Sequence, residues 1–115
     1  MYRFSYAETM ESFSDHSRGR EKMAIDYVIG RLEAGLEKGL RSPEAVQAMH
    51  ETRRLWAFFL EDLAKRENEL PEALRADLIS IGLFILKELE RIRREESDDL
   101  SGIIEINTII RDGLN

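Results

Sequence analysis

Apolar residues recur at steps of three and four along most of the chain, and this spacing predicts amphipathic helices rather than strands. In a first predicted helix, 14–38, the recurring residues are Ile25, Val28, Ile29, Leu32 and Leu36. Gly39 follows at once and suits the left-handed conformation in which many helices end. Ser42 and Pro43 then fit an N-cap and a first-turn residue, so a second helix is expected over 43–65.

The second and third predicted helices hold most of the bulky apolar side chains. One side of the second helix carries Val46, Met49, Trp56, Phe59, Leu60 and Leu63. Pro71 can open a third helix, 71–96, with two adjacent apolar stripes: Leu74, Leu78, Ile81, Ile85, Leu89 and Ile92, then Ile79, Leu83 and Leu86. So wide an apolar arc is typical of a helix in the middle of a bundle. We therefore expect a core formed by Trp56, Phe59, Leu63, Leu78, Ile81 and Ile85.

A fourth segment, 100–112, contains five isoleucines among the eight residues 103–110. This density of β-branched residues favours a strand, but a single strand would find no partner in an otherwise helical chain. A helical stripe fits as well and comprises Leu100, Ile103, Ile106 and Ile110. Ser97, Asp98 and Asp99 precede the segment and can break and re-cap the chain, so we predict a helix.

The N-terminal arm, 1–13, stands apart from the helical segments. It contains four aromatic residues, Tyr2, Phe4, Tyr6 and Phe13. Because disordered tails are poor in aromatic residues, we expect the arm to dock on a surface. Its own bundle is the simpler interpretation, and a partner protein is the alternative.

The composition agrees with an all-α fold, a small single-domain helical bundle of about four helices with an aromatic N-terminal arm. The 115 residues suffice for one domain, and 43% hydrophobic with 35% charged residues suits amphipathic helices. The lack of cysteine excludes disulfides and thiolate chemistry. No secretory signal pattern is visible, and the longest uncharged run, 78–86, is nine residues, half a membrane span. We expect a cytoplasmic protein without a membrane span.

Residues with catalytic or metal-binding chemistry form no familiar motif. His16 and His50 belong to different segments, and neither has the spacing of a metal site. Ser80 lacks the glycine-flanked context of a nucleophilic serine. The acidic segment 95–99 lacks the alternating oxygen ligands of a cation-binding loop. We therefore expect no enzyme, no cofactor and no metal site.

Nucleic-acid binding is disfavoured by the net charge of −6, because such binding needs a concentrated positive field. The best candidates to contact single-stranded bases are Arg53, Arg54 and Trp56. Trp56, however, falls on the apolar side of its helix, which favours packing in the core.

Three stretches carry a more specific signal: MYRFSYAETM at the start, RRLWAFFLEDLAKRENELPEALRADLISIGLFIL in the middle and IIEINTIIRDGLN at the end. Together they resemble the FlaF family of alphaproteobacterial flagellar biosynthesis regulators. The agreement in order and spacing covers essentially the whole chain, and its most specific part runs from Leu55 to Leu78. The segment 18–41 would identify nothing alone.

The resemblance implies a cytoplasmic flagellum biogenesis factor that acts on flagellin, opposite the translational regulator FlbT. It brings no catalytic residue. Two mechanisms stay open: binding flagellin as a chaperone for its export, which also supports its synthesis, or acting directly on translation of flagellin mRNA. An acidic, apolar-rich helical module favours the first, since a helix laid in an apolar groove is a common recognition mode.

The predicted flagellin-binding site centres on the last helix, whose isoleucines exceed what one shallow contact needs. The candidate residues are Leu83, Leu86, Leu100, Ile103, Ile104, Ile106, Ile109 and Ile110. A helical end of flagellin would contact this helix, or compete with it for a groove beside Leu83 and Leu86. An ordinary fourth bundle helix is the alternative, and the same apolar surplus would also suit a homo-oligomer.

Overall fold

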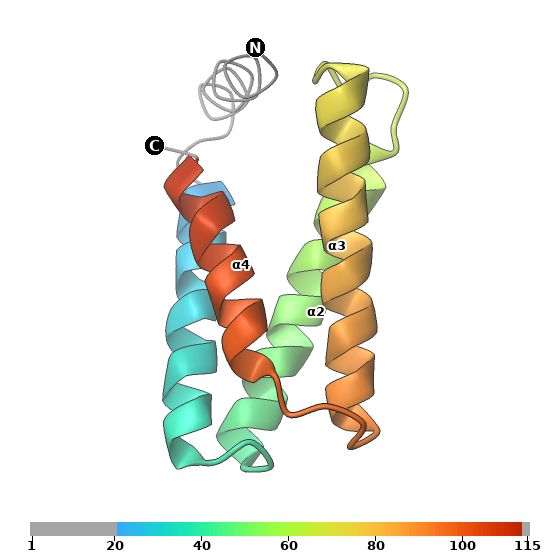
Figure 1. The fold of residues 1–115 in the computed structure, drawn as a ribbon. Coiled ribbons are helices and arrows are strands. Elements are labelled where there is room, and N and C mark those ends of the chain that lie inside the picture. Colours follow the sequence, from blue (N-terminus) through green and yellow to red (C-terminus); the bar gives the residue numbers. More distant parts are fainter. Residues whose placement is uncertain (1–20, 114–115) are drawn as a thin grey trace.

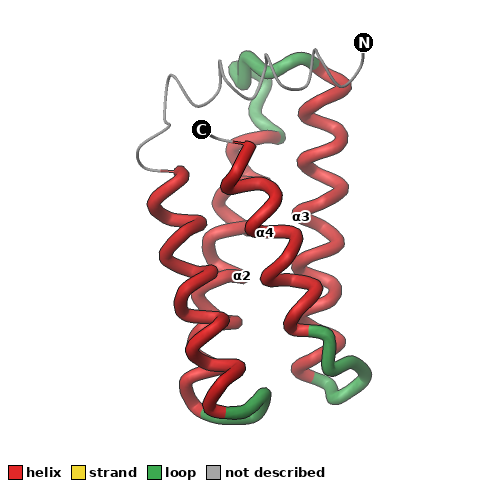
Figure 2. The backbone as a smooth tube through the Cα atoms, turned by 60° about the vertical axis from the view of Figure 1, so that its left-hand side comes forward, coloured by secondary structure: helices red, strands yellow, loops and turns green. Residues whose placement is uncertain are grey.

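The computed structural model describes residues 21–113, and these fold into four helices with no strand among them (Figure 1). The first helix occupies 21–38 of the described residues and is followed by α2 (Pro43–Leu63), α3 (Glu72–Arg93) and α4 (Leu100–Gly113). Successive helices run in opposite directions along the bundle (Figures 1 and 2). The all-α prediction is confirmed, although α2 and α3 end before the predicted limits at 65 and 96. The arm 1–13 and the segment 14–20 lie outside the described residues.

The turn between the first helix and α2 has the geometry that its sequence predicts. Gly39 has a positive φ of 119°, and its N–H donates to the carbonyls of Gly35 and Leu36 at the end of the first helix. Ser42 Oγ then accepts a hydrogen bond from the N–H of Ala45 at 3.1 Å, which caps α2. These local contacts reverse the chain within a few residues and set the first helix against α2.

The turn after α3 uses an unusual residue. Glu95 has a φ of 63°, in the left-handed region where glycine is favoured. The N–H of Glu95 donates to the carbonyl of Ile92 and the N–H of Glu96 to that of Arg91, which together form a Schellman motif. Asp99 then caps α4 by accepting from the N–H of Gly102 at 3.0 Å.

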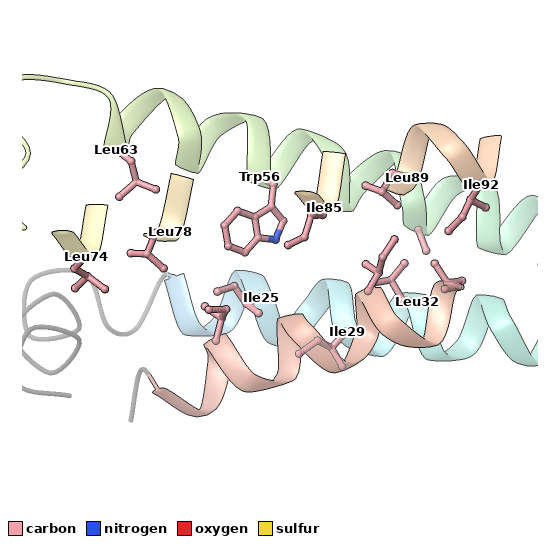
Figure 3. Close-up of a cluster of buried hydrophobic side chains, with 14 residues drawn as sticks. Ile25, Ile29, Leu32, Trp56, Leu63, Leu74, Leu78, Ile85, Leu89 and Ile92 are labelled. Carbon is pink, nitrogen blue, oxygen red and sulfur yellow. The ribbon is translucent and has the colours of Figure 1, made fainter. Parts of the chain in front are cut away.

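One hydrophobic cluster joins all four helices (Figure 3). Trp56 points from α2 into the space between the helices and is 2% exposed. Of the six predicted core residues, the buried ones are Trp56, Leu63, Leu78 and Ile85, while Phe59 and Ile81 are half-buried and pack against the cluster. The edge of one ring of the Trp56–Phe59 pair meets the face of the other at a centroid distance of 5.3 Å.

Two glycines let helices approach closely. A Cβ atom on Gly35 would lie 2.6 Å from the Cα of Ala45, so only glycine fits where the first helix meets α2. A Cβ on Gly82 would lie 2.8 Å from Leu60 Cδ2 and 3.1 Å from Trp56 Cε3, so α3 also packs tightly on α2. The α2–α3 pair therefore makes a close helical hairpin.

A buried polar pair connects α4 to α2. Trp56 Nε1–H donates to Asn107 Oδ1 at 2.8 Å, and Asn107 Nδ2 donates to the carbonyl of Ile103 at 2.8 Å. Asn107 is fully buried, whereas Ile106 is half-buried. The predicted stripe of α4 missed Asn107, which is buried in one row with Leu100, Ile103 and Ile110, while Ile106 packs against the core from the edge of this row.

Candidate protein-binding surfaces

The eight residues predicted to bind flagellin differ widely in exposure. Leu100, Ile103 and Ile110 are buried in the core. Leu86, Ile104 and Ile106 are half-buried and pack against the core cluster. Leu83 and Ile109 are exposed by 56% and 62%. Most of the predicted set is thus structural, and only part of it is accessible to a partner.

Two of the eight residues, Leu83 and Leu86, belong to α3 and the other six to α4. Leu86 shares its helix face with Gly82 and Leu89, one turn away on either side, and Gly82 contacts α2. Phe84 instead shares its face with Glu88, whose carboxylate accepts hydrogen bonds from Ser97 and Arg91 beside the connection to α4. Leu86, which is half-buried, is therefore on the side of α3 that packs on α2, and Leu83, one turn before it, is exposed to solvent.

A different apolar surface lies where α3 and α4 face each other. Arg111 Nη1 pairs with Asp26 Oδ1 of the first helix at 2.7 Å, which orients one flank of α4 towards that helix. Helical spacing puts Ile106 and Ile109 on the other flank, towards α3. The two helices diverge towards the C-terminal end of α4 (Figures 1 and 2).

We call this surface the α3–α4 face and define it by Ile81, Phe84, Ile106 and Ile109. Ile109 is exposed by 62% and Phe84 by 51%, and the half-buried Ile106 and Ile81 lie one helical turn before them. Sequence reasoning missed Phe84 because it falls outside both apolar stripes of α3. It was nevertheless visible as the one aromatic residue in the uncharged run 78–86.

A second apolar area lies along the first helix and α2. Its exposed side chains are Met23, Tyr27 and Phe58. Tyr27 Oη donates to Glu51 Oε2 at 3.4 Å, and Arg31 Nε pairs with Glu51 Oε1 at 3.0 Å. Burial tends to raise the pKa of Glu51, but the hydrogen bonds from Arg31, Gln47 and Tyr27 hold it below its ordinary value. This area is polar at one end and is fixed by an ion pair between the two helices.

A cavity of about 320 Å³ opens between α2 and α3, and none of its lining residues belongs to α4 or to the α3–α4 face. Its apolar lining comes from Val46 and Met49 on α2 and Leu89 on α3. Val46 is exposed to solvent, so the cavity is open at this side. Its predominantly apolar lining gives it the character of a small binding pocket.

The rim of this cavity is rich in arginine. Arg93 is held by Glu90 through Nε–H to Oε1 at 2.9 Å, and the hydrogen bond from Arg93 lowers the pKa of Glu90 to about 2. Arg41 donates to the carbonyl of Ile92. In residues 21–113, Arg53 has no hydrogen bond or ion pair and remains available to a ligand.

The residues considered for catalysis and nucleic-acid binding are dispersed. Trp56 is buried and bonded to Asn107, so it cannot stack on a base. Ser80 is exposed, His50 lies at the cavity and His16 lies outside the described residues. In the described part of the chain, no three His, Cys, Asp or Glu side chains are grouped to hold a metal ion. Nor does any helix within 21–113 combine the length and apolarity needed to cross a membrane.

Comparison with known families gives one clear result. Residues 2–114 match the family model described as Flagellar protein FlaF. No curated protein and no solved structure matches the chain.

Proposed function

The chain belongs to the FlaF family of flagellar proteins, and from this premise we propose that it supports flagellum biogenesis by binding flagellin directly. In this proposal it acts as an export chaperone in the cytoplasm, and by holding flagellin for secretion it also permits flagellin synthesis. The observation that carries the proposal is the α3–α4 face, where Phe84 and Ile109 are exposed beside half-buried isoleucines.

The chemistry of this face suits an amphipathic helix. Exposed aliphatic side chains occur singly on most proteins, whereas a large aromatic and an isoleucine on facing helix edges can form one contact surface. Ile81 and Ile106 are partly buried, pack against the core cluster and add further apolar area beside Phe84 and Ile109. Flagellin ends are amphipathic helices, and their apolar side could pack against this area as in other helix-in-groove complexes.

The α4 helix supplies one wall of the face, and its angle is set from inside the bundle. The Trp56–Asn107 hydrogen bond fixes the middle of α4, and the Asp99 cap fixes its start. Towards its C-terminal end, α4 diverges from α3 (Figure 1). A helical end of flagellin would fill or widen the space between α3 and the C-terminal end of α4. The core contacts of Leu100 and Ile103 at the start of α4 would persist.

An effect on translation follows indirectly in this proposal. Of the three residues expected to contact flagellin mRNA, Arg53, Arg54 and Trp56, only Trp56 could stack on a base, and it is buried. The net charge of −6 also opposes a phosphate backbone. We therefore propose that the functional link to FlbT runs through the amount of flagellin held, rather than through contact of this protein with the message.

A calorimetric titration of the full chain with purified flagellin tests the proposal. Wild-type protein should bind, and Phe84→Ser should weaken binding about tenfold or more, since the loss of a buried aromatic anchor commonly costs over 1 kcal/mol. Phe58→Ser is the matched control, because Phe58 is 62% exposed on a different helix flank. The proposal fails if wild-type protein shows no binding at micromolar concentrations, or if both variants bind like wild type.

A further inference from the structure

The cavity between α2 and α3 points to a second binding site, independent of the flagellin proposal. It combines the apolar lining of Val46, Met49 and Leu89 with the guanidinium of Arg53, which has no hydrogen bond or ion pair to any residue of 21–113. We propose that this cavity binds an acidic peptide segment of another protein, with a carboxylate at Arg53 and a neighbouring aliphatic side chain on the apolar lining. This face is separate from the α3–α4 face, so one molecule can engage two partners.

The charges at the rim select an anion although the protein as a whole is acidic. Glu90 is already paired with both Arg93 and Arg94, at 2.5 and 2.8 Å. Arg41 is engaged by the carbonyl of Ile92 and lies 3.7 Å from Asp98. Among the arginines at the rim, Arg53 is thus the one without a hydrogen bond or ion pair to any residue of 21–113. A carboxylate can accept two parallel hydrogen bonds from such a guanidinium.

His50 adds a second polar group on the same helix face. It lies three residues before Arg53, about one helical turn away, and also lines the cavity. Within the described residues it has no hydrogen bond or ion pair either. An imidazole N–H can donate to the second oxygen of the same carboxylate or to the peptide backbone. The two side chains form a donor pair beside an apolar patch.

The lining favours a peptide over a nucleic acid. Single-stranded nucleic acids need aromatic platforms for their bases, and the cavity lining contains none. The carboxylates of Glu90 and Glu95 at the rim would repel a run of phosphates. A peptide brings one carboxylate to Arg53, so it meets those rim carboxylates with one negative charge instead of several, and its aliphatic neighbour needs no aromatic platform.

The length of the cavity favours an internal acidic residue over a chain terminus. Val46 and Arg53 both line it and are seven residues apart on α2. This spacing spans about 10 Å along the helix, so a peptide can lie along the opening. The proposed ligand is therefore an Asp or Glu side chain within a continuous peptide segment.

Selection of a displayed random peptide library on the full chain tests this site. Peptides of about twelve residues are long enough to span the opening. The recovered sequences should share an acidic residue next to an aliphatic one. A synthetic copy should bind Arg53→Gln about tenfold more weakly than wild type, because a hydrogen bond to a charged group is lost.

Arg54→Gln is the matched control, since Arg54 is the next residue, is exposed and does not line the cavity. It should bind the peptide within about twofold of wild type. Changing the peptide's acid to its amide should reproduce the Arg53→Gln loss, and combining both changes should add little further loss. Val46→Asp should also abolish binding, because it places a carboxylate on the apolar lining.

Four outcomes would overturn the proposal. The first is a selection without acidic–aliphatic peptides, and the second is equal binding to Arg53→Gln and wild type. The third is loss of binding when the peptide's C-terminus is amidated, which would indicate a terminal carboxylate. The fourth is tighter, Arg53-dependent binding of a single-stranded RNA oligomer, which would reassign the cavity to nucleic acid.

Discussion

The helix α3 packs against α2 on one flank and against α4 on the other, and the two contacts differ in kind. On one flank α2 packs against it at the distance that Gly82 permits, and the buried side chains of both helices meet without a polar link. On the other flank α4 diverges and is anchored by the Trp56–Asn107 hydrogen bond to α2 rather than to α3. The α2–α3 pair is thus a closely packed hairpin, whereas α4 is held by a buried polar pair together with its core contacts. The proposed flagellin site lies on the α4 side.

The largest expected effect is on the hydrophobic cluster that joins the helices. Trp56→Ala removes the side chain at the centre of the cluster and leaves Asn107 without its donor. We expect a loss of about 3–5 kcal/mol in the free energy of unfolding. Chemical denaturation followed by circular dichroism measures it. A wild-type midpoint would mean that the indole does not hold the helices together.

A smaller loss should follow from breaking the polar anchor of α4 alone. Asn107→Ala leaves the buried Trp56 N–H unsatisfied, which should cost about 1–3 kcal/mol. The control is the double variant Trp56→Phe with Asn107→Leu, which removes both polar partners. If the double variant is less stable than Asn107→Ala, the hydrogen bond is not the main reason for the loss.

The connection from α3 to α4 should depend on pH through Glu88. Its carboxylate is nearly buried, and the hydrogen bond from Ser97, with that from Arg91, holds its pKa below the ordinary value. Because the folded pKa is the lower one, this stabilisation is fully present above the unfolded pKa, roughly 4.3, and is lost as the pH falls through the folded pKa.

The variant Glu88→Gln should lose about 1–2 kcal/mol at neutral pH. Denaturation curves across the acid range should show the gap between wild type and variant closing below about pH 4.3. A gap that stays constant down to strongly acidic pH would show that the charge of Glu88 contributes nothing.

The smallest predicted effect concerns the same connection. Glu95 holds a left-handed conformation that costs a non-glycine residue about 1 kcal/mol or more. Glu95→Gly should therefore raise stability by up to about 1 kcal/mol, with part of the gain offset by the freer unfolded chain. Thermal unfolding measures this change, and a lowered melting temperature would contradict the assignment of strain to this turn.

The helices could be predicted from the sequence because their apolar period and caps are local properties. The turn at Gly39 and Ser42 is an example, since each residue acts within a few positions of itself. The position of Asn107 in the buried row of α4 could also be predicted from the sequence. Leu100, Ile103, Asn107 and Ile110 follow steps of three, four and three, but the neighbouring Ile106 fits a helical stripe equally well and is apolar.

The surfaces could not be predicted in the same way. Helical period says which residues share a face, but it does not say which neighbour packs against each flank. Leu83 and Phe84 are adjacent in sequence and both exposed, yet only the packing of α3 against its neighbours decides which of them can share a surface with α4. The rim of the cavity likewise joins Arg53 to Arg93, two residues that only the α2–α3 pairing brings together.

The most direct test of the central claim is photocrosslinking to flagellin from defined positions on the two helix flanks. A photoreactive phenylalanine analogue placed at Phe84 or at Phe58 keeps an exposed aromatic side chain at each site. The account predicts a crosslink to flagellin from position 84 and none from position 58. Crosslinking from position 58 alone would place flagellin on the first helix and α2, and would contradict the assignment of the α3–α4 face.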